Sequence, residues 1–366
     1  MTTFDNKYAL QLAEKKQRLT DLLLPFTQQN LEVFESPPQN YRMRAEFRIW
    51  HEGERSFHIM FDKESKSKYE VEYLPAACQL INDAMKDTIA LVCEQPLLRA
   101  KLFQIDYLAS TTNELVISLI YHKQLDSSWE DAAQALKQAL SHLGTINIIG
   151  RAKKQKVVIG EDYVIEKLRL EAQETAKDYI FKQVENSFTQ PNANINVKML
   201  NWTLGRLRGS EGDLLELYCG AGNFSIPLAS IFRRVFATEI SKSSVNAAQY
   251  NIDANAVSNV VIARLSSEEF TEAYKGARAF FRLKDIELHN YQFSTVLVDP
   301  PRAGLDADTL KLISQFKRIV YISCNPNTLA NNLVTLSETH HVEHAALFDQ
   351  FPFTEHIETG VVLKKR

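Results

Sequence analysis

Cys324 is the residue of this 366-residue chain that is best placed to do chemistry. It follows the apolar residues 320–322 and Ser323, and it precedes Asn325-Pro326. Strands seldom continue through proline, so we expect Cys324 at the carboxyl end of a strand. In open α/β sheets ligands bind beyond that edge, where a thiol can serve as a nucleophile. The competing interpretation is a buried cysteine that only packs, which is common for free thiols.

A glycine turn follows another apolar strand. Residues 213–218 lead into Gly220 and Gly222, which open a segment with helical spacing. This is the setting of a nucleotide-type cofactor loop, although it lacks the G-x-G-x-x-G pattern of dinucleotide folds. The next predicted strand ends at Glu239, whose carboxylate could accept two ribose hydroxyls. Together these features are typical of an S-adenosylmethionine (AdoMet) site with Gly220 in its loop, and a tight turn beside a surface acid is the alternative.

Two further groups of polar residues adjoin predicted strands. Asp299 ends an apolar strand and could bind the cofactor's amino group or a substrate N–H, and Arg302 could bind a phosphate or a developing anion. Glu358 starts the last apolar strand, where partly apolar surroundings raise the pKa of a carboxyl group and suit it to act as a general base. His356 is the rival base, and spacing alone does not decide between them.

The elements that must hold these side chains follow from the apolar periodicity. From about residue 195 to residue 338, apolar strands alternate with helices of 10–15 residues, which predicts βαβ units and a parallel sheet. Strands near 342–348 and 357–364 follow with no helix between them, so we expect an antiparallel strand to close the sheet. The fold class expected for this half is therefore α/β.

The earlier part of the chain has a different pattern. A leading helix near 8–25 precedes hairpins near 42–61 and 102–121, with helices between and after them. This strand-rich α+β region predicts a separate domain. We expect the two domains to comprise residues 1–178 and 179–366.

Composition excludes several classes of protein. Apolar residues make up 45% of the chain, the net charge is −3, and no apolar stretch approaches the roughly 18 residues of a membrane helix. Any nucleic-acid partner must therefore meet local basic patches. Cys78, Cys93, Cys219 and Cys324 are widely spaced, which argues against a disulfide framework or a zinc site and fits a reducing cytosol.

Several segments, in one order along most of the chain, resemble the AdoMet-dependent RNA uracil-5-methyltransferases, and more narrowly the bacterial branch that acts on tRNA. They are residues 41–48, 183–192, 215–220, 299–302, 323–326 and 356–358. The resemblance implies a class I, Rossmann-like fold with a mostly parallel seven-stranded sheet. It implies Cys324 as the nucleophile and Glu358 as the proton acceptor. It also implies contacts to AdoMet from Gln190, Tyr218, Asn223, Glu239 and Asp299.

The ribosomal-RNA branch of that family typically adds an OB-like domain and a four-cysteine iron–sulfur site. The cysteines of this chain are too few and wrongly spaced for such a site, so we expect neither a metal nor an iron–sulfur cluster. The tRNA branch is favoured, whose target is uridine 54 in the T-loop of the T-arm, with transfer-messenger RNA as a further substrate. No membrane and no obligate protein partner is expected.

Contacts to RNA are expected from the N-terminal region. Arg42, Arg44 and Arg48 alternate with apolar residues and should share one strand face, with Phe57 and His58 on the neighbouring strand. Lys154 belongs to a second basic run at residues 151–156. Solvated surface charge is the alternative for each of these residues.

Other functions remain compatible with the sequence. The same chemistry could act on ribosomal or transfer-messenger RNA, or the chain could be an RNA-binding or chaperone-like protein with a vestigial site. An amino- or DNA-methyltransferase could use residues 299–301 on an exocyclic amine, and that chemistry has no need of Cys324.

Overall fold

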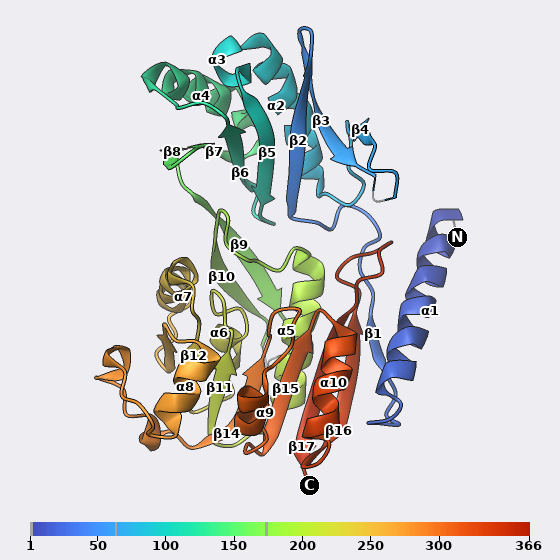
Figure 1. Ribbon diagram of the computed structural model, residues 1–366, viewed down its shortest axis with the longest axis vertical. Coiled ribbons are helices and arrows are strands. Elements are labelled where there is room, and N and C mark those ends of the chain that lie inside the picture. Colours follow the sequence, from blue (N-terminus) through green and yellow to red (C-terminus); the bar gives the residue numbers. More distant parts are fainter. Residues whose placement is uncertain (1–2, 63, 173–174) are drawn as a thin grey trace. The chain divides into compact units, whose positions relative to one another are not determined.

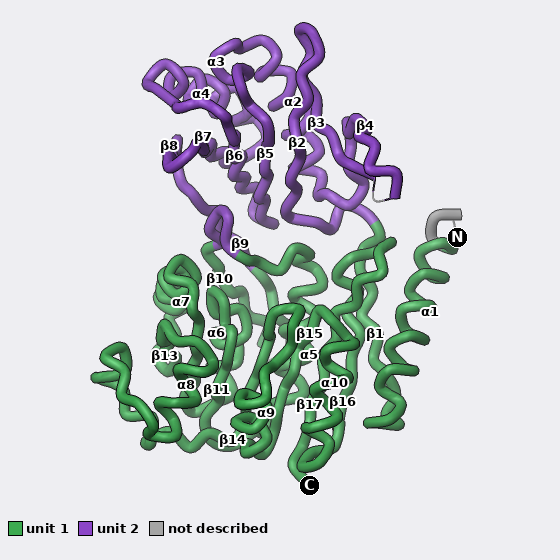
Figure 2. The backbone as a smooth tube through the Cα atoms, in the orientation of Figure 1, with its two compact units in different colours: residues 1–38, 168–182, 188–366 green, residues 39–167, 183–187 purple. Residues whose placement is uncertain are grey.

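The computed structural model describes residues 3–62, 64–172 and 175–366, which form two compact units (Figure 2). The larger unit comprises the chain up to Pro38, Leu168–Lys182 and Phe188–Arg366; the inserted unit comprises Gln39–Lys167 and Gln183–Ser187. This division differs from the expected one at residue 178, because the first 38 residues pack with the larger unit.

The larger unit is built on an eight-stranded sheet in the order β1-β16-β17-β15-β14-β11-β12-β13 (Figure 1). All neighbours are parallel except β17, which runs antiparallel between β15 and β16, as expected for the last strand. The strands are β1 (Glu32–Phe34), β11 (Asp213–Leu217), β12 (Val235–Thr238), β13 (Val260–Ala263), β14 (Phe293–Val298), β15 (Arg318–Ser323), β16 (His340–Phe348) and β17 (Glu358–Lys365).

The predicted seven-stranded sheet is present, and β1 adds an eighth strand that the sequence did not reveal. Its three residues are too few to show a strand period, and their partners in β16 lie more than 300 positions away, with Glu32 opposite Ala346. The strand forms because its partner edge is already built by the distant half of the chain.

Helices cover both faces of this sheet (Figure 1). In β15, Ile319 and Tyr321 pack toward α1, α9 and α10, whereas Val320 and Ile322 pack toward α5 and α6. This alternation is what a strand buried on both faces requires. The helices are α1 (Thr3–Leu23), α5 (Ala193–Leu207), α6 (Ser225–Leu228), α7 (Lys242–Ala254), α8 (Ser267–Tyr274), α9 (Ala307–Ile313) and α10 (Pro326–Leu336).

Two short 3₁₀ turns, Phe281–Leu283 and Leu288–Asn290, interrupt the connection from α8 to β14, and β9 (Tyr163–Leu170) pairs with β10 (Lys177–Val184) in a separate ribbon. None of the described helices is long and apolar enough to cross a membrane.

The inserted unit is a seven-stranded sheet in the order β4-β3-β2-β5-β6-β7-β8 with helices packed on one face. Ala45, Phe47 and Ile49 of β2 are buried in its core beside Trp129 of α4, as the alternation predicts. The elements are β2 (Arg44–Glu52), β3 (Arg55–Phe61), β4 (Lys68–Glu70), α2 (Gln79–Glu94), α3 (Pro96–Arg99), β5 (Leu102–Ala109), β6 (Glu114–Tyr121), α4 (Ser127–Ala139), a 3₁₀ turn (Ser141–Leu143), β7 (Thr145–Ala152) and β8 (Gln155–Ile159).

Candidate active site

Five of the predicted site residues meet at one edge of the larger sheet. Strands β11, β12, β14 and β15 are parallel, and they end immediately before Tyr218, Glu239, Asp299 and Cys324 respectively. Strand β17 runs in the opposite direction, so its first residue, Glu358, lies at the same edge. Topology alone therefore brings together side chains that are as much as 140 positions apart in the sequence.

Cys324 occupies the junction between a strand and a helix. Strand β15 ends at Ser323, and α10 begins at Pro326 with Asn325 as its N-cap, whose side chain accepts a hydrogen bond from the Asn327 amide at 3.2 Å. Proline is well suited to the first turn of a helix because it lacks an amide hydrogen. The thiol is consequently partly exposed at the edge of the sheet, where a substrate can reach it.

Glu358 is a buried carboxyl group beside that thiol. It is 5% exposed, and its Oε1 atom has no hydrogen-bond partner among the described residues. Burial raises the pKa of Glu358 well above its usual value, and Asp299 raises it further, while Arg302 lowers it. A raised pKa makes the carboxylate of Glu358 a stronger base than an ordinary glutamate, which suits it to accept a proton.

The same electrostatic environment acts on the other groups at this edge. Burial raises the pKa of the Cys324 thiol, the negative charges of Glu358 and Asp299 raise it further, and Arg302 lowers it. Burial also raises the pKa of Asp299 to about 7. Burial first, and the acids second, thus favour the protonated thiol, and bound cationic groups would favour its ionisation.

The glycine turn after β11 is strained at Tyr218. Its φ of 64° lies in the left-handed region, which non-glycine residues rarely adopt, and its hydroxyl is 2.7 Å from Ser267 Oγ. Gly220 and Gly222 have φ values of 56° and 82°. Such strain gathers at ligand sites and persists only where the surroundings enforce it.

Glu239 stabilises this turn through hydrogen bonds. Its carboxylate accepts a hydrogen bond from the Gly220 amide at 3.0 Å and another from the Ser241 amide at 2.7 Å. A carboxylate has about four acceptor positions, so two remain for ribose hydroxyls. Asn223 lies in the same turn and exchanges two amide hydrogen bonds of 2.9 Å with Asn196 of α5.

Gln190 reaches the same edge from the segment before α5. Its Nε2 lies 3.5 Å from Asp299 Oδ2, and its Oε1 accepts a hydrogen bond of 2.7 Å from Gln350 Nε2. Gln350 is 1% exposed and was missed by the sequence analysis, because no motif surrounds it. Two expected cofactor contacts, Gln190 and Asp299, therefore lie against each other, and a residue that only the fold reveals, Gln350, holds Gln190 from its other end.

Arg302 is held against the start of α10. Its carbonyl accepts hydrogen bonds of 3.2 Å from Asn325 Nδ2 and from Thr328 Oγ1. Its guanidinium lies 3.2 Å from His356 Nδ1. His356, the rival base, is thus engaged with Arg302, whereas Glu358 is buried beside the thiol, so the geometry favours Glu358.

Glu216 is a second buried acid that spacing did not single out as titratable. It is fully buried in β11 and accepts a hydrogen bond from Ser225 Oγ. Burial raises its pKa to about 8, so it is mainly protonated at neutral pH. It lies inside the sheet behind the glycine turn.

The candidate RNA contacts in the inserted unit are in different settings. Lys154 is exposed in the β7–β8 turn, Arg48 is exposed with its guanidinium 5.3 Å from the Phe103 ring, and Phe57 is partly buried. Arg44 is partly buried and donates a hydrogen bond of 2.9 Å to the Ser187 carbonyl.

The structure departs from the expected setting of two residues of this unit. Arg42 lies outside β2, which begins at Arg44, and forms an isolated bridge with Ala77. His58 is 3% exposed in the core, 2.9 Å from the Tyr107 hydroxyl, and burial lowers its pKa to about 3. The alternation of apolar and polar residues shows neither where a strand begins nor whether a polar side chain is buried, so neither departure could be read from it.

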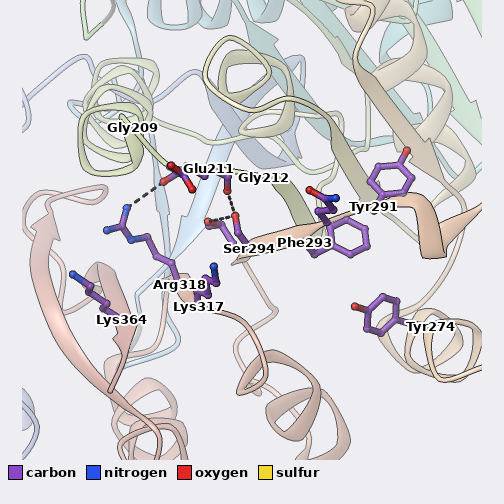
Figure 3. Close-up of a pocket in the computed structure, with 13 residues that line it drawn as sticks. Gly209, Glu211, Gly212, Tyr274, Tyr291, Phe293, Ser294, Lys317, Arg318 and Lys364 are labelled. Atoms are coloured by element: carbon purple, nitrogen blue, oxygen red, sulfur yellow. Dashed lines mark hydrogen bonds between the residues drawn. The ribbon is translucent and has the colours of Figure 1, made fainter.

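A pocket of about 600 Å³ lies at the opposite edge of the larger sheet (Figure 3). It is lined by residues that precede β11 and open β14 and β15, such as Gly212, Phe293 and Lys317. Parallel strands bind ligands at their carboxyl ends, so this pocket is separate from the site around Cys324. Within the described part of the chain, no group of three or more His, Cys, Asp or Glu side chains is placed to hold a metal ion.

An open α/β sheet with a glycine turn after its first central strand and acids after the next strands defines a class I AdoMet-dependent methyltransferase. The chain belongs to the tRNA (uracil-5-)-methyltransferase family, whose model matches residues 7–366.

Relatives match over the whole length. The chain is 57% identical to a tRNA/tmRNA (uracil-C(5))-methyltransferase of Aggregatibacter aphrophilus (strain NJ8700), with 98% of each chain covered. It is 54% identical to the protein of that name from Vibrio vulnificus (strain YJ016), with 100% of each covered. A crystal structure of Pyrococcus abyssi tRNA (uracil-54, C5)-methyltransferase with S-adenosyl-L-homocysteine superposes with a TM-score of 0.71 at 20% identity, covering 97% of this chain and 83% of that one, which shows a shared fold.

Proposed function

We propose that this protein transfers a methyl group from AdoMet to C5 of uridine 54 in the T-loop of tRNA, with transfer-messenger RNA as a further substrate. The observation that carries the proposal is the pairing of a partly exposed thiol, Cys324, with a buried carboxyl group, Glu358, on adjacent strands at the cofactor edge. Four free thiols fit a reducing compartment, so we place the enzyme in the cytoplasm.

The cofactor residues fit AdoMet by their chemistry. Glu239 retains acceptor capacity for ribose hydroxyls, and Asp299 offers a carboxylate for an ammonium group. Glu358 Oε1, which has no hydrogen-bond partner among the described residues, lies at the same edge and can accept a hydrogen bond from a bound group. AdoMet supplies the electrophilic methyl group.

The proposed reaction begins with Cys324, because C5 of uracil is a poor nucleophile. The thiolate forms a bond to C6, and the displaced electron pair makes C5 nucleophilic as an enolate, which Arg302 is placed to stabilise. C5 then forms a bond to the methyl carbon while the bond from that carbon to the sulfonium sulfur breaks, and the sulfur leaves as a neutral thioether. Glu358 removes the proton from C5, the electron pair re-forms the C5–C6 double bond, and the Cys324–C6 bond breaks to regenerate the thiolate.

The target base must leave its stack before the thiol can reach it, at a cost of a few kcal/mol. RNA loops are recognised by shape, stacking and backbone contacts. We assign this recognition to the inserted unit, where Lys154 and Arg48 offer exposed cations and Phe57 a partly buried ring.

The test is a covalent trap. The enzyme is incubated with AdoMet and tRNA carrying 5-fluorouridine, and the products are separated on a denaturing gel. Fluorine at C5 cannot leave as a proton, so the adduct should persist, and peptide mapping should place it on Cys324 and uridine 54.

Cys324→Ala is the control and should give no adduct. Methylation of ordinary tRNA by Cys324→Ala at the normal rate would overturn the covalent mechanism. An adduct with ribosomal RNA but none with a T-arm hairpin would overturn the substrate assignment.

A further inference from the structure

Helix α1 is bonded to the segment that connects β16 to the proposed base. Lys15 Nζ is 2.6 Å from Asp349 Oδ1 and donates a second hydrogen bond of 2.9 Å to the Phe351 carbonyl. Both charged side chains are buried, at 3% exposure for Lys15 and 0% for Asp349. An ion pair buried to this degree is often no more stabilising than apolar packing, so a gain in stability does not by itself explain why the two charges lie here.

The same helix holds the far end of the segment. Gln11 Nε2 donates to the Thr354 carbonyl at 2.6 Å, and Gln11 Oε1 accepts from the Phe353 amide at 3.3 Å. Arg18 donates to the Glu355 carbonyl. One helix thus bonds to backbone groups along residues 351–355, which lie between β16 and β17.

Both ends of the segment lead into the site. Next to Asp349, Gln350 donates to Gln190, which in turn contacts Asp299. Beyond Glu355, His356 lies against Arg302, and Glu358 follows as the first residue of β17. Residues 349–356 therefore form a segment that borders the site. Its start, at Gln350, contacts the cofactor residue Gln190, and its end, at His356, leads to the base Glu358.

We propose that Lys15 and Gln11 of α1 are positioning residues for methyl transfer, Lys15 for the cofactor end of residues 349–356 and Gln11 for the base end. The inference rests on the proposed roles of Glu358 and Gln190. It gives a catalytic purpose to a helix that the sequence placed in the RNA-binding region.

The experiment compares three single variants of the full-length enzyme: Lys15→Met, Gln11→Ala and the control Lys16→Met. Lys16 is exposed on the same helix and one position away, so its variant makes the same chemical change without touching the segment. Affinity for AdoMet is measured by calorimetry, turnover with ordinary tRNA by methyl incorporation, and covalent enzyme–tRNA adduct on denaturing gels.

Lys15→Met should weaken AdoMet binding roughly tenfold, the scale of a lost positioned hydrogen bond. Gln11→Ala should leave AdoMet binding within about twofold but slow turnover roughly tenfold or more, because a displacement of about 1 Å can cost up to ~10²-fold. It should also accumulate adduct on ordinary tRNA, since a misplaced base leaves the methylated adduct unresolved. Lys16→Met should match the unmodified enzyme.

A merely structural role would lower activity in proportion to the folded fraction, with no change in AdoMet affinity and no adduct, and that result would overturn the inference for either residue. If Lys15→Met does not fold, Lys15→Met/Asp349→Asn removes both charges together, and unaltered AdoMet affinity in that variant overturns the role of Lys15. Glu358→Gln on the same gel separates the two proposals, because its failure to accumulate adduct would reject the base itself.

Discussion

Cys324 and Glu358 each lie one residue beyond the last paired residues of β15 and β17, Ser323 and Thr359. Glu358 is itself paired with Phe348 of β16, and its neighbour Thr359 is paired with Ser323 of β15, so the backbone at the base is held by β16 directly and by β15 one residue away. The distance between nucleophile and base is thus set by strand register, and a slip of one residue would turn Glu358 to the other face of the sheet.

Replacing Glu358 by Gln should separate the two halves of the reaction. The amide cannot take the C5 proton, so turnover should fall by at least about 10²-fold while addition and methyl transfer still occur. Methylated enzyme–tRNA adduct should accumulate on ordinary tRNA, and mass spectrometry should show the added methyl group. Loss of turnover without any adduct would mean that Glu358 acts before methyl transfer.

Binding of AdoMet should depend on pH through Asp299. Its pKa of about 7 in the protein alone means that a proton must leave before the carboxylate can meet an ammonium group. Affinity measured by calorimetry should therefore rise by up to about tenfold per pH unit between pH 5.5 and 7. Asp299→Asn should bind more weakly with a flat profile, and an equally steep profile in this variant would assign the titration to another group.

Removing the charge of Arg302 should make Cys324 less reactive. Arg302 lowers the pKa of that thiol against the effects of burial, Glu358 and Asp299, so Arg302→Gln should move its ionisation to higher pH. Alkylation of Cys324 by iodoacetamide, followed by mass spectrometry across a pH series, measures this directly. Arg302→Lys keeps the charge and should show a smaller change, whereas identical profiles for Gln and Lys would exclude a charge effect.

Lys154→Ala should weaken tRNA binding without affecting AdoMet. An exposed lysine that meets a phosphate releases counterions, so its loss should reduce the salt dependence of log K by about 1. Lys86→Ala, which removes an exposed charge from α2 of the same unit, is the matched control. Arg44→Ala is a poorer test, because Arg44 is partly buried and bonded to the Ser187 carbonyl. Equal affinities for Lys154→Ala and Lys86→Ala would remove Lys154 from the interface.

The sequence predicted the parts of the site that depend on strand ends. Gly220, Glu239, Asp299 and Cys324 each follow an apolar run, and apolar runs stop where a parallel sheet ends, so their common edge could be inferred. Neither the strain at Tyr218 nor the hydrogen bond from Gln350 to Gln190 could be inferred, because both arise from contacts between distant segments.

The choice between Glu358 and His356 illustrates the same limit. Both precede one apolar strand, and spacing treats them alike. They differ in surroundings, since Glu358 is enclosed by β15 and β16 whereas His356 meets Arg302. Strand β1 and the packing of α1 were missed for a related reason, because their partners lie hundreds of residues away.

The pairing of β1 with β16 has a consequence for synthesis on the ribosome. Residues 32–34 emerge early, but their partners at 346–348 emerge only after some 300 further residues have been translated. The inserted unit, formed almost entirely by residues 39–167, can fold in the interval, since domains generally fold as units during synthesis. Strand β1 cannot pair until β16 has been synthesised. The β1–β16 pairing and the proposed base, Glu358, therefore become available to the larger unit at nearly the same time. A nascent chain can therefore carry a folded inserted unit, to which we assign RNA recognition, well before its methyltransferase site is complete.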